Sequence, residues 1–328
     1  MTTHPVHIRV AQQDDVAGLV ELWQHAFTPP LQPDQWLAEP DRLVHTLVAV
    51  DDEGICGSIY GLPKRLREDD GESALVHCIG SVAVAERTRG RGVARRLVSA
   101  SLDSAEGGWA LLFTGTPEVY RSSGFTSFTM QRVRRGPWQA TATDGREADV
   151  GSADERSAPE VRVSRRRVAA GCLAPLQDVY ERSRDGVVLA PVRSARDWTM
   201  AEVRLHDAEL WIAQAQEPAG GRGVLGYAVT RTRAEDGALR GVIEEFAVDP
   251  DAPQRLADAL LRAIGDDWAA VGVTSCELAV PATTQMQEQV EEFAPEARPA
   301  PDDTGMIRPL RREARVAGIR HFTAADYF

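Results

Sequence analysis

The stretch at residues 79–96, IGSVAVAERTRGRGVARR, constrains the fold of this chain more than any other part of the sequence. Val82 and Val84 alternate with Ala83, which predicts the end of a β-strand. From Val93 onward, apolar residues recur at helical spacing, so one face of a helix can pack on a sheet. The stretch therefore predicts a strand, a loop with two glycines and the first turns of a helix.

The loop has the composition of an anion-binding site. A helix N-terminus leaves its first amides without intrahelical partners and has a partial positive charge. Gly90 and Gly92 have no Cβ to keep a phosphate away from the backbone. The neighbouring arginines add charge for outer phosphates: Arg87, Arg89 and Arg91. The alternative is a solvated, arginine-rich loop that only begins an ordinary helix.

Residues 89–94 fit the pattern Arg-x-x-Gly-x-Ala, which resembles the acyl-CoA pyrophosphate signature of the GCN5-related N-acetyltransferases (GNAT). A P-loop is excluded because no Gly-Lys-Ser or Gly-Lys-Thr is present, and the glycine spacing differs from that of a Rossmann fold. The resemblance implies acetyl-CoA as co-substrate, with the N–H of Val84 on the thioester carbonyl. The residues that it implies for cofactor binding are Val82, Ala83, Val84, Arg89, Gly90, Arg91, Gly92, Val93, Ala94 and Arg95.

The order of the predicted elements agrees with this family. In the first half, strands are expected at 6–10, 46–50, 55–61, 73–84, 109–114 and 126–133, and helices at 16–27, 93–102 and 117–123. The second half repeats the outline, with strands at 161–168, 210–215, 224–231, 239–248 and 274–280, and helices at 175–182, 195–204 and 258–270. The chain therefore resembles an α/β protein of two tandem GNAT folds, each a mixed, mostly antiparallel sheet flanked by helices.

Composition separates the two halves. Residues 140–160 are small, polar and charged with a single valine, so they cannot bury enough apolar surface to fold. The expected domains are a catalytic domain with the acetyl-CoA site at 1–137, a linker or mobile loop at 138–160, a degenerate second domain at 161–310 and a C-terminal tail at 311–328.

The second half has Asp249-Pro250-Asp251-Ala252-Pro253-Gln254-Arg255 at the position of the glycine loop. Carboxylates repel a pyrophosphate, and prolines lack the amides that would bind it. We therefore expect no coenzyme site in the second half.

A second motif, Tyr120-Arg121-Ser122-Ser123-Gly124-Phe125, supports the resemblance. In the family, a tyrosine just before a Gly-Phe turn lies beside the coenzyme sulfur and gives a proton to the leaving thiolate. Tyr120 is therefore the expected general acid. The alternative is a half-buried aromatic before a turn.

An active first unit followed by a degenerate second unit resembles the enhanced-intracellular-survival (Eis) class of aminoglycoside N-acetyltransferases. Those proteins usually have a third, sterol-carrier-like domain, for which the 18 residues after Leu310 leave no room. In that class the C-terminal carboxylate reaches the active site of the first domain and serves as the base, which implies this role for Phe328. The alternative is a tail that docks on the second domain as a closing strand.

The same resemblance implies that aromatic residues wall the acceptor pocket: Trp23, Phe27 and Trp36. Ordinary core packing is the alternative for each of them. His77 and Glu86 are further candidates for the base, although a lone histidine on a strand is more often a structural residue.

Charge and cysteine content indicate which ligands and partners the protein is expected to bind. Acidic residues outnumber basic ones by 49 to 37, and this net charge of −12 argues against nucleic acid and favours a cationic small-molecule acceptor. There is no run of about 18 apolar residues and no signal peptide, which predicts a cytoplasmic protein without a membrane span. The cysteines do not have metal-ligand spacing, so no metal is expected. The oligomeric state stays open, and a homo-oligomer is compatible with the sequence.

The sequence thus predicts an enzyme that moves an acetyl group from acetyl-CoA to a primary amine of a cationic small molecule, such as an aminoglycoside, a polyamine or lysine. One alternative is a tandem acetyltransferase resembling mycothiol synthase, in which the second unit should be the active one. Another is a non-catalytic acyl-CoA sensor, in which the loop binds coenzyme but Tyr120 performs no chemistry.

Overall fold

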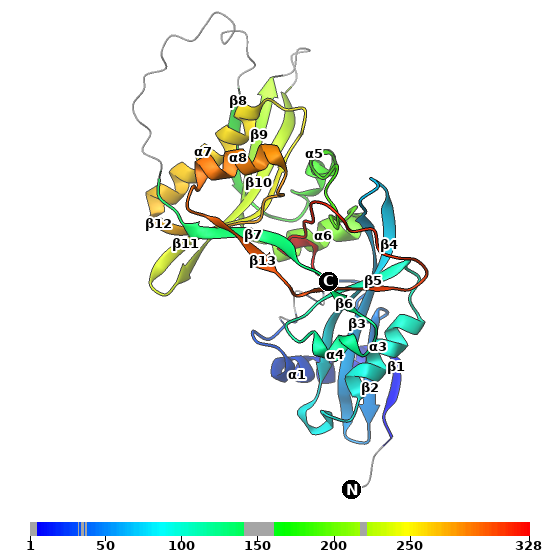
Figure 1. Cartoon of the computed structure of the whole chain (residues 1–328). Helices are drawn as coiled ribbons and strands as arrows, with labels where there is room; N and C mark the ends of the chain where they lie inside the picture. The colour runs from blue at the N-terminus through cyan, green and yellow to red at the C-terminus, as the bar shows by residue number, and fades with distance from the viewer. Residues whose placement is uncertain (1–4, 32, 34–35, 37, 141–160, 217–221) are drawn as a thin grey trace, which may run out of the picture.

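The structure of the chain is a computed structural model, shown in Figure 1. It describes residues 5–31, 33, 36, 38–140, 161–216 and 222–328. The expected linker at 138–160 therefore lies almost entirely outside the described residues. Within them, two sheets of seven strands each form the framework, which confirms the predicted α/β architecture with helices flanking two mixed sheets.

The first sheet has the strand order β1-β2-β3-β4-β5-β14-β6. All neighbouring strands are antiparallel except β4 and β5, which are parallel. Its strands are β1 (His7–Val10), β2 (Thr46–Asp51), β3 (Gly54–Arg67), β4 (Ser73–Val84), β5 (Trp109–Phe113), β6 (Thr126–Ser127) and β14 (Gly305–Pro309).

The second sheet has the order β13-β7-β12-β11-β10-β9-β8 and repeats the pattern, with the parallel pair at β11 and β12. Its strands are β7 (Met130–Pro137), β8 (Val161–Arg167), β9 (Glu209–Gln216), β10 (Arg222–Glu235), β11 (Ala238–Val248), β12 (Val273–Leu278) and β13 (Arg298–Asp302).

The two sheets exchange strands. β7 follows the first sheet in the chain but pairs with β12 and β13 of the second sheet. In return, β14 comes from the end of the chain and pairs with β5 and β6 of the first sheet. No single point of the chain therefore separates the residues of one sheet from those of the other. The domain limits expected from the sequence stay a prediction.

The helices cover the sheets as amphipathic patterning predicts. On α3 (Val93–Asp103), the buried residues include Val93, Leu97 and Val98, which pack in one core with Ile59 of β3. α7 (Gln254–Val271) packs on the second sheet (Figure 1). The other helices are α1 (Val16–Ala26), α4 (Glu118–Arg121), α5 (Gln177–Ser183), α6 (Ala195–Arg204) and α8 (Thr284–Phe293).

Two expectations about strands were wrong. The strand expected at 55–61 is longer than predicted, since β3 continues to Arg67. This strand tolerates its charges because they are paired: buried Lys64 lies 2.9 Å from Asp197, and Arg67 forms an ion pair with Glu181.

The other concerns the strand expected at 126–133, which is divided into β6 and β7, and these belong to different sheets. No element was expected after residue 280, where the structure has α8, β13 and β14. Among the described residues, none of the helices combines the length and the apolarity that crossing a bilayer requires.

Met306 on β14 tests the strand exchange. Its side chain is fully buried in the core of the first sheet, beside Leu112 and Tyr120. Met306→Ala should lower the free energy of unfolding by about 2–5 kcal/mol, measured by urea unfolding, because it leaves a cavity in that core. Met306→Leu is the control and should cost less than about 1.5 kcal/mol. An alanine variant with the stability of the unmodified protein would contradict the placement of β14.

Candidate active site

The site begins where β4 leaves β5. The two strands pair from Val76 with Trp109 to Ile79 with Leu112, and residues 80–84 continue β4 without a partner from β5. A bulge against β3 lies at the same place, between Ser58 and Tyr60, and Ser81 there has a φ of 50°. A bulge bends a strand, and a left-handed serine is a strained position typical of functional sites. The opening between β4 and β5 leaves one edge of residues 80–84 free for an extended ligand.

The backbone of Val84 presents its N–H to that opening. The N–H of Ala85 donates to the carbonyl oxygen of Cys56 on β3, at 2.9 Å. Successive N–H groups of a strand point to opposite edges, so the N–H of Val84 points away from β3. This is the direction that polarisation of a thioester between β4 and β5 requires.

The two-glycine loop leads directly into α3. Gly90 and Gly92 have φ values of 74° and 76°, a left-handed conformation that favours glycine. Gly92 is the N-cap of α3, and the N–H of Arg96 donates to its carbonyl oxygen at 3.1 Å. The amides just before Arg96 therefore have no acceptor within the helix and are available to an anion.

The structure brings the predicted cofactor residues together at the end of β4 and the start of α3. Those on β4 are Val82, Ala83 and Val84, and the loop and helix contribute Arg89, Gly90, Arg91, Gly92, Val93, Ala94 and Arg95. The guanidinium of Arg87 forms an ion pair with Asp51. Its expected contact with an outer phosphate stays a prediction.

Tyr120 lies on α4 and belongs to the same hydrophobic core as Val93 and Leu97 of α3. It is 8% exposed, and its ring meets that of Phe125 edge-on at 6.2 Å. Burial raises the pKa of Tyr120 to about 12. The phenol therefore stays protonated at neutral pH and has a proton to give.

The C-terminal tail runs between the two halves and ends at β4 (Figure 1). A Cβ built on Gly80 would lie 2.5 Å from the main-chain oxygen of Phe328 and 3.0 Å from its carbonyl carbon. Gly80 is the first residue of β4 beyond the part that pairs with β5. The main chain of Phe328 thus lies against the opening between β4 and β5, and only glycine allows this approach.

Side chains of the tail fasten it on both sides. Phe322 is fully buried, with its ring 5.1 Å from that of Phe113 on β5. Asp326 lies 2.8 Å from Arg193, and its carbonyl oxygen accepts from Lys64 of β3 at 3.0 Å. The tail thus contacts both halves, and among the described residues it adds no strand to the second sheet.

The aromatic residues expected to wall an acceptor pocket lie in a core cluster of the first half. Trp23 is 1% exposed, and its indole N–H donates to the hydroxyl of Ser58 at 2.8 Å. Trp36 is also buried and meets Trp23 edge-on at 4.5 Å, while Phe27 is half-buried at the margin. Core packing accounts for both tryptophans, and the wall role of the three residues stays a prediction.

A charged group that the sequence analysis did not predict lies beside Ser81. Arg42 donates to the hydroxyl of Ser81 at 2.5 Å, and its guanidinium lies 3.7 Å from the centre of the Tyr60 ring. Buried Glu39 forms ion pairs with Arg42 and with Arg196 of α6, each at 2.9 Å. These residues belong to no motif, and the fold alone brings them together.

The two other candidates for the base have different surroundings. His77 is buried between β4 and α3, and its Nε2 lies 2.8 Å from the hydroxyl of Ser101. Burial lowers the pKa of His77 to about 4, which suits a neutral structural histidine. Glu86 is exposed in the loop.

The second half differs at the equivalent of the glycine loop. There the carboxylate of Asp249 accepts from the N–H of Asp251 at 3.0 Å and pairs with Arg182 at 2.8 Å. Acidic and proline residues occupy the start of α7, where the first half has glycines. The described residues contain no group of three or more His, Cys, Asp or Glu side chains that could bind a metal ion.

Comparison with known protein families gives one domain match. The model of the acetyltransferase (GNAT) domain matches residues 7–128, which include β4, the glycine loop and Tyr120. The protein is therefore an acyltransferase, and the family to which this domain belongs uses acyl-CoA. No curated protein matches the sequence significantly.

Solved structures are similar over nearly the whole chain. A GCN5-related N-acetyltransferase from Anabaena variabilis ATCC 29413 has a TM-score of 0.69 and 14% identity, covering 93% of this chain and 73% of that one. One from Kribbella flavida has 0.64 and 18%, covering 94% and 72%. Eis1 from Mycobacterium abscessus has 0.61 and 15%, covering 93% and 74%. At these identities the likeness concerns the fold, and the two mixed sheets of this chain are consistent with two tandem GNAT-like units.

Proposed function

We propose that the acetyltransferase domain at residues 7–128 transfers the acetyl group of acetyl-CoA to a primary amine of a small, cationic acceptor, such as an aminoglycoside, a polyamine or lysine. The observation that carries the proposal is the glycine loop, where left-handed Gly90 and Gly92 lead into the N-terminus of α3 beside the open edge of β4. The net charge of −12 supports a cationic acceptor over nucleic acid. The proposal includes a cytoplasmic location of the enzyme.

The proposed reaction uses four groups of this chain. The amides at the start of α3 bind the pyrophosphate, and the N–H of Val84 polarises the thioester carbonyl. A base takes the proton of the attacking ammonium group, the amine nitrogen bonds to the acetyl carbon, and the carbon–sulfur bond breaks. Tyr120 gives its proton to the leaving thiolate, and the resulting tyrosinate takes up the second proton, which the acetylated nitrogen loses.

We assign the base to the carboxylate that Phe328 has as the last residue of this sequence. The position of its main chain against Gly80 supports the assignment, because the opening of β4 and β5 is where the thioester would lie. The likeness to Eis1 supports a tandem enzyme of this kind. Trp23, Phe27 and Trp36 would then border the acceptor from the side of α1.

The cofactor site is tested by Gly92→Glu. The new carboxylate would face the pyrophosphate and strain a left-handed position, so the Kd of acetyl-CoA should rise roughly tenfold or more, as measured by calorimetry. Gly71→Glu is the matched control, because Gly71 also has a positive φ, of 82°, and open space around it. Unchanged affinity in Gly92→Glu would contradict the cofactor site.

The reaction itself is tested by measuring thiol release from acetyl-CoA with a panel of aminoglycosides, polyamines and lysine. Binding of acetyl-CoA without thiol release on any of these amines would favour an acyl-CoA sensor.

The role of Tyr120 predicts a separate effect on turnover. Tyr120→Phe should lower kcat roughly 100-fold, because the thiolate loses its proton donor, while the Kd of acetyl-CoA stays unchanged. Steady-state kinetics and calorimetry on the same variant measure the two quantities. A kcat equal to that of the unmodified enzyme would remove Tyr120 from the mechanism.

The terminal carboxylate predicts that the position of the chain end matters. A glycine added after Phe328 moves the carboxylate about 3.5 Å along the chain and should lower kcat at least roughly tenfold. Phe328→Leu is the control, since it retains the carboxylate in place and should retain most of the rate. Full turnover in the extended variant would exclude this base.

A further inference from the structure

A hollow beside the glycine loop is lined by positive charge without counter-ions. Its volume is about 560 Å³, and its lining residues are Arg95, Arg96, Ser99, Ser122, Ser123, Gly124 and Arg308. None of them is acidic. In the part of the chain that the structure describes, no carboxylate lies within ion-pair distance of Arg95 or Arg308, and Arg96 donates to the main-chain oxygen of Val6 at 2.7 Å.

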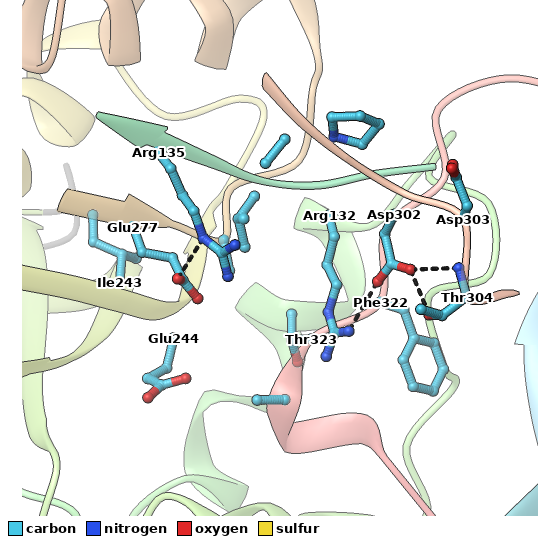
Figure 2. A pocket seen from close by; sticks show the side chains of 15 residues that line it. Arg132, Arg135, Ile243, Glu244, Glu277, Asp302, Asp303, Thr304, Phe322 and Thr323 are labelled. Atoms are coloured by element: carbon cyan, nitrogen blue, oxygen red, sulfur yellow. Dashed lines mark hydrogen bonds and ion pairs between the residues drawn. The ribbon is translucent and has the colours of Figure 1, made fainter. Parts of the chain in front are cut away.

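A second hollow, in the other half, has carboxylates beside its arginines. It has a volume of about 370 Å³, and its arginines are paired within the wall, Arg132 with Asp302 at 2.9 Å and Arg135 with Glu277 at 2.7 Å (Figure 2). Its wall also contains Glu244 and Asp303, so acidic residues outnumber the arginines there. Unpaired arginines around one hollow are therefore a feature of the loop side of the first half, in a chain with a net charge of −12.

The hollow adjoins the loop that binds pyrophosphate in the proposed function. A Cβ built on Gly92 would lie 3.9 Å from a terminal guanidinium nitrogen of Arg95. On the other side, a Cβ on Gly124 would lie 3.5 Å from Nε of Arg308. An anion in the hollow would thus lie between a helix that starts at the loop and a strand from the end of the chain.

We propose that this hollow binds the 3′-phosphate of the coenzyme and that Arg308 is the residue that distinguishes coenzyme A from its 3′-dephospho form; this rests on the proposed function of the loop. In coenzyme A the ribose that bears the pyrophosphate also bears the 3′-phosphate, so the two anions are one sugar apart. A phosphomonoester has a charge between −1.5 and −2 near pH 7, and the planar guanidinium of arginine binds it in a bidentate manner. The hydroxyls of Ser122 and Ser123 can donate to its remaining oxygens.

This assignment gives the second half of the chain a part in cofactor binding. Arg308 belongs to β14, which follows the whole second sheet in sequence and is inserted between β5 and β6. The first half therefore contributes the pyrophosphate amides, and the exchanged strand contributes the cation for the 3′-phosphate.

The experiment compares the Kd of coenzyme A and of 3′-dephospho-coenzyme A by calorimetry. The unmodified protein should bind coenzyme A roughly tenfold more tightly, which is the range for a charge-assisted hydrogen bond. Arg308→Gln should weaken coenzyme A about tenfold and leave the dephospho form unchanged, which also shows that the variant is folded. Arg308→Lys should retain part of the preference. Arg121→Gln is the matched control, because Arg121 is exposed on α4 and does not line the hollow.

The outcomes separate this proposal from the proposed function. If the unmodified protein binds neither ligand, both proposals fail. If it binds both ligands equally, or if Arg308→Gln weakens both or neither, only the 3′-phosphate assignment is overturned. Inorganic phosphate that binds in an Arg308-dependent way, without any preference for coenzyme A over the dephospho form, would mark a separate phosphate site and would also overturn it.

Discussion

The pairing of β14 with β5 is the interaction on which the rest of the first half depends. β5 gives one edge to β4, and its other edge would present unpaired N–H and C=O groups in the interior. β14 pairs with that edge along its full length, from Gly305 with Phe113 to Pro309 with Trp109. The same strand places Met306 in the core beneath α3 and Arg308 beside the cofactor loop. The proposed cofactor site at residues 79–96 is therefore bordered by residues from the opposite end of the chain.

The exchange also determines how the two halves are joined. β7 leaves the first half and pairs with β12 on one side and β13 on the other, so both sheets contain main-chain hydrogen bonds to the other half. Strand pairing restricts the relative position of the two halves more than side-chain contacts alone would, because the register determines which residues lie opposite each other. The tail then crosses at this junction, which explains how residue 328 reaches β4 after the chain has completed the second sheet.

Features that depend on local sequence could be predicted, and features that depend on distant pairing could not. β4 and the start of α3 were predicted at their observed positions, because alternation, the two glycines and the helical period are all present within residues 73–102. The capping of α6 by Ser194, which accepts from the N–H of Asp197, is local in the same way. β14 was missed because five residues ending in proline have no period, and its partner Leu111 is separated from it by the whole second half. Arg42 and Arg308 escaped prediction since only tertiary packing places them at the site.

The direction of the tail is fixed by a buried charge and not by the tail's own conformation. Arg193 is 3% exposed and lies between Glu245 of β11 and Asp326 of the tail, with an Nη1 to Glu245 distance of 3.1 Å. Burial alone would raise the pKa of Asp326, but Arg193 and Lys64 lower it below its ordinary value, so the carboxylate is charged in the folded protein.

A charged group buried in this way is stable only with its partners, because an unpaired buried ion costs several kcal/mol. The second half thus positions Asp326 through Arg193, and the first half positions it through Lys64 of β3. Two residues of extended chain span about 7 Å, which leaves little freedom for the end of the tail once Asp326 is fixed. The position of Phe328 against Gly80 therefore depends on the ion cluster that Asp326 forms between the two halves.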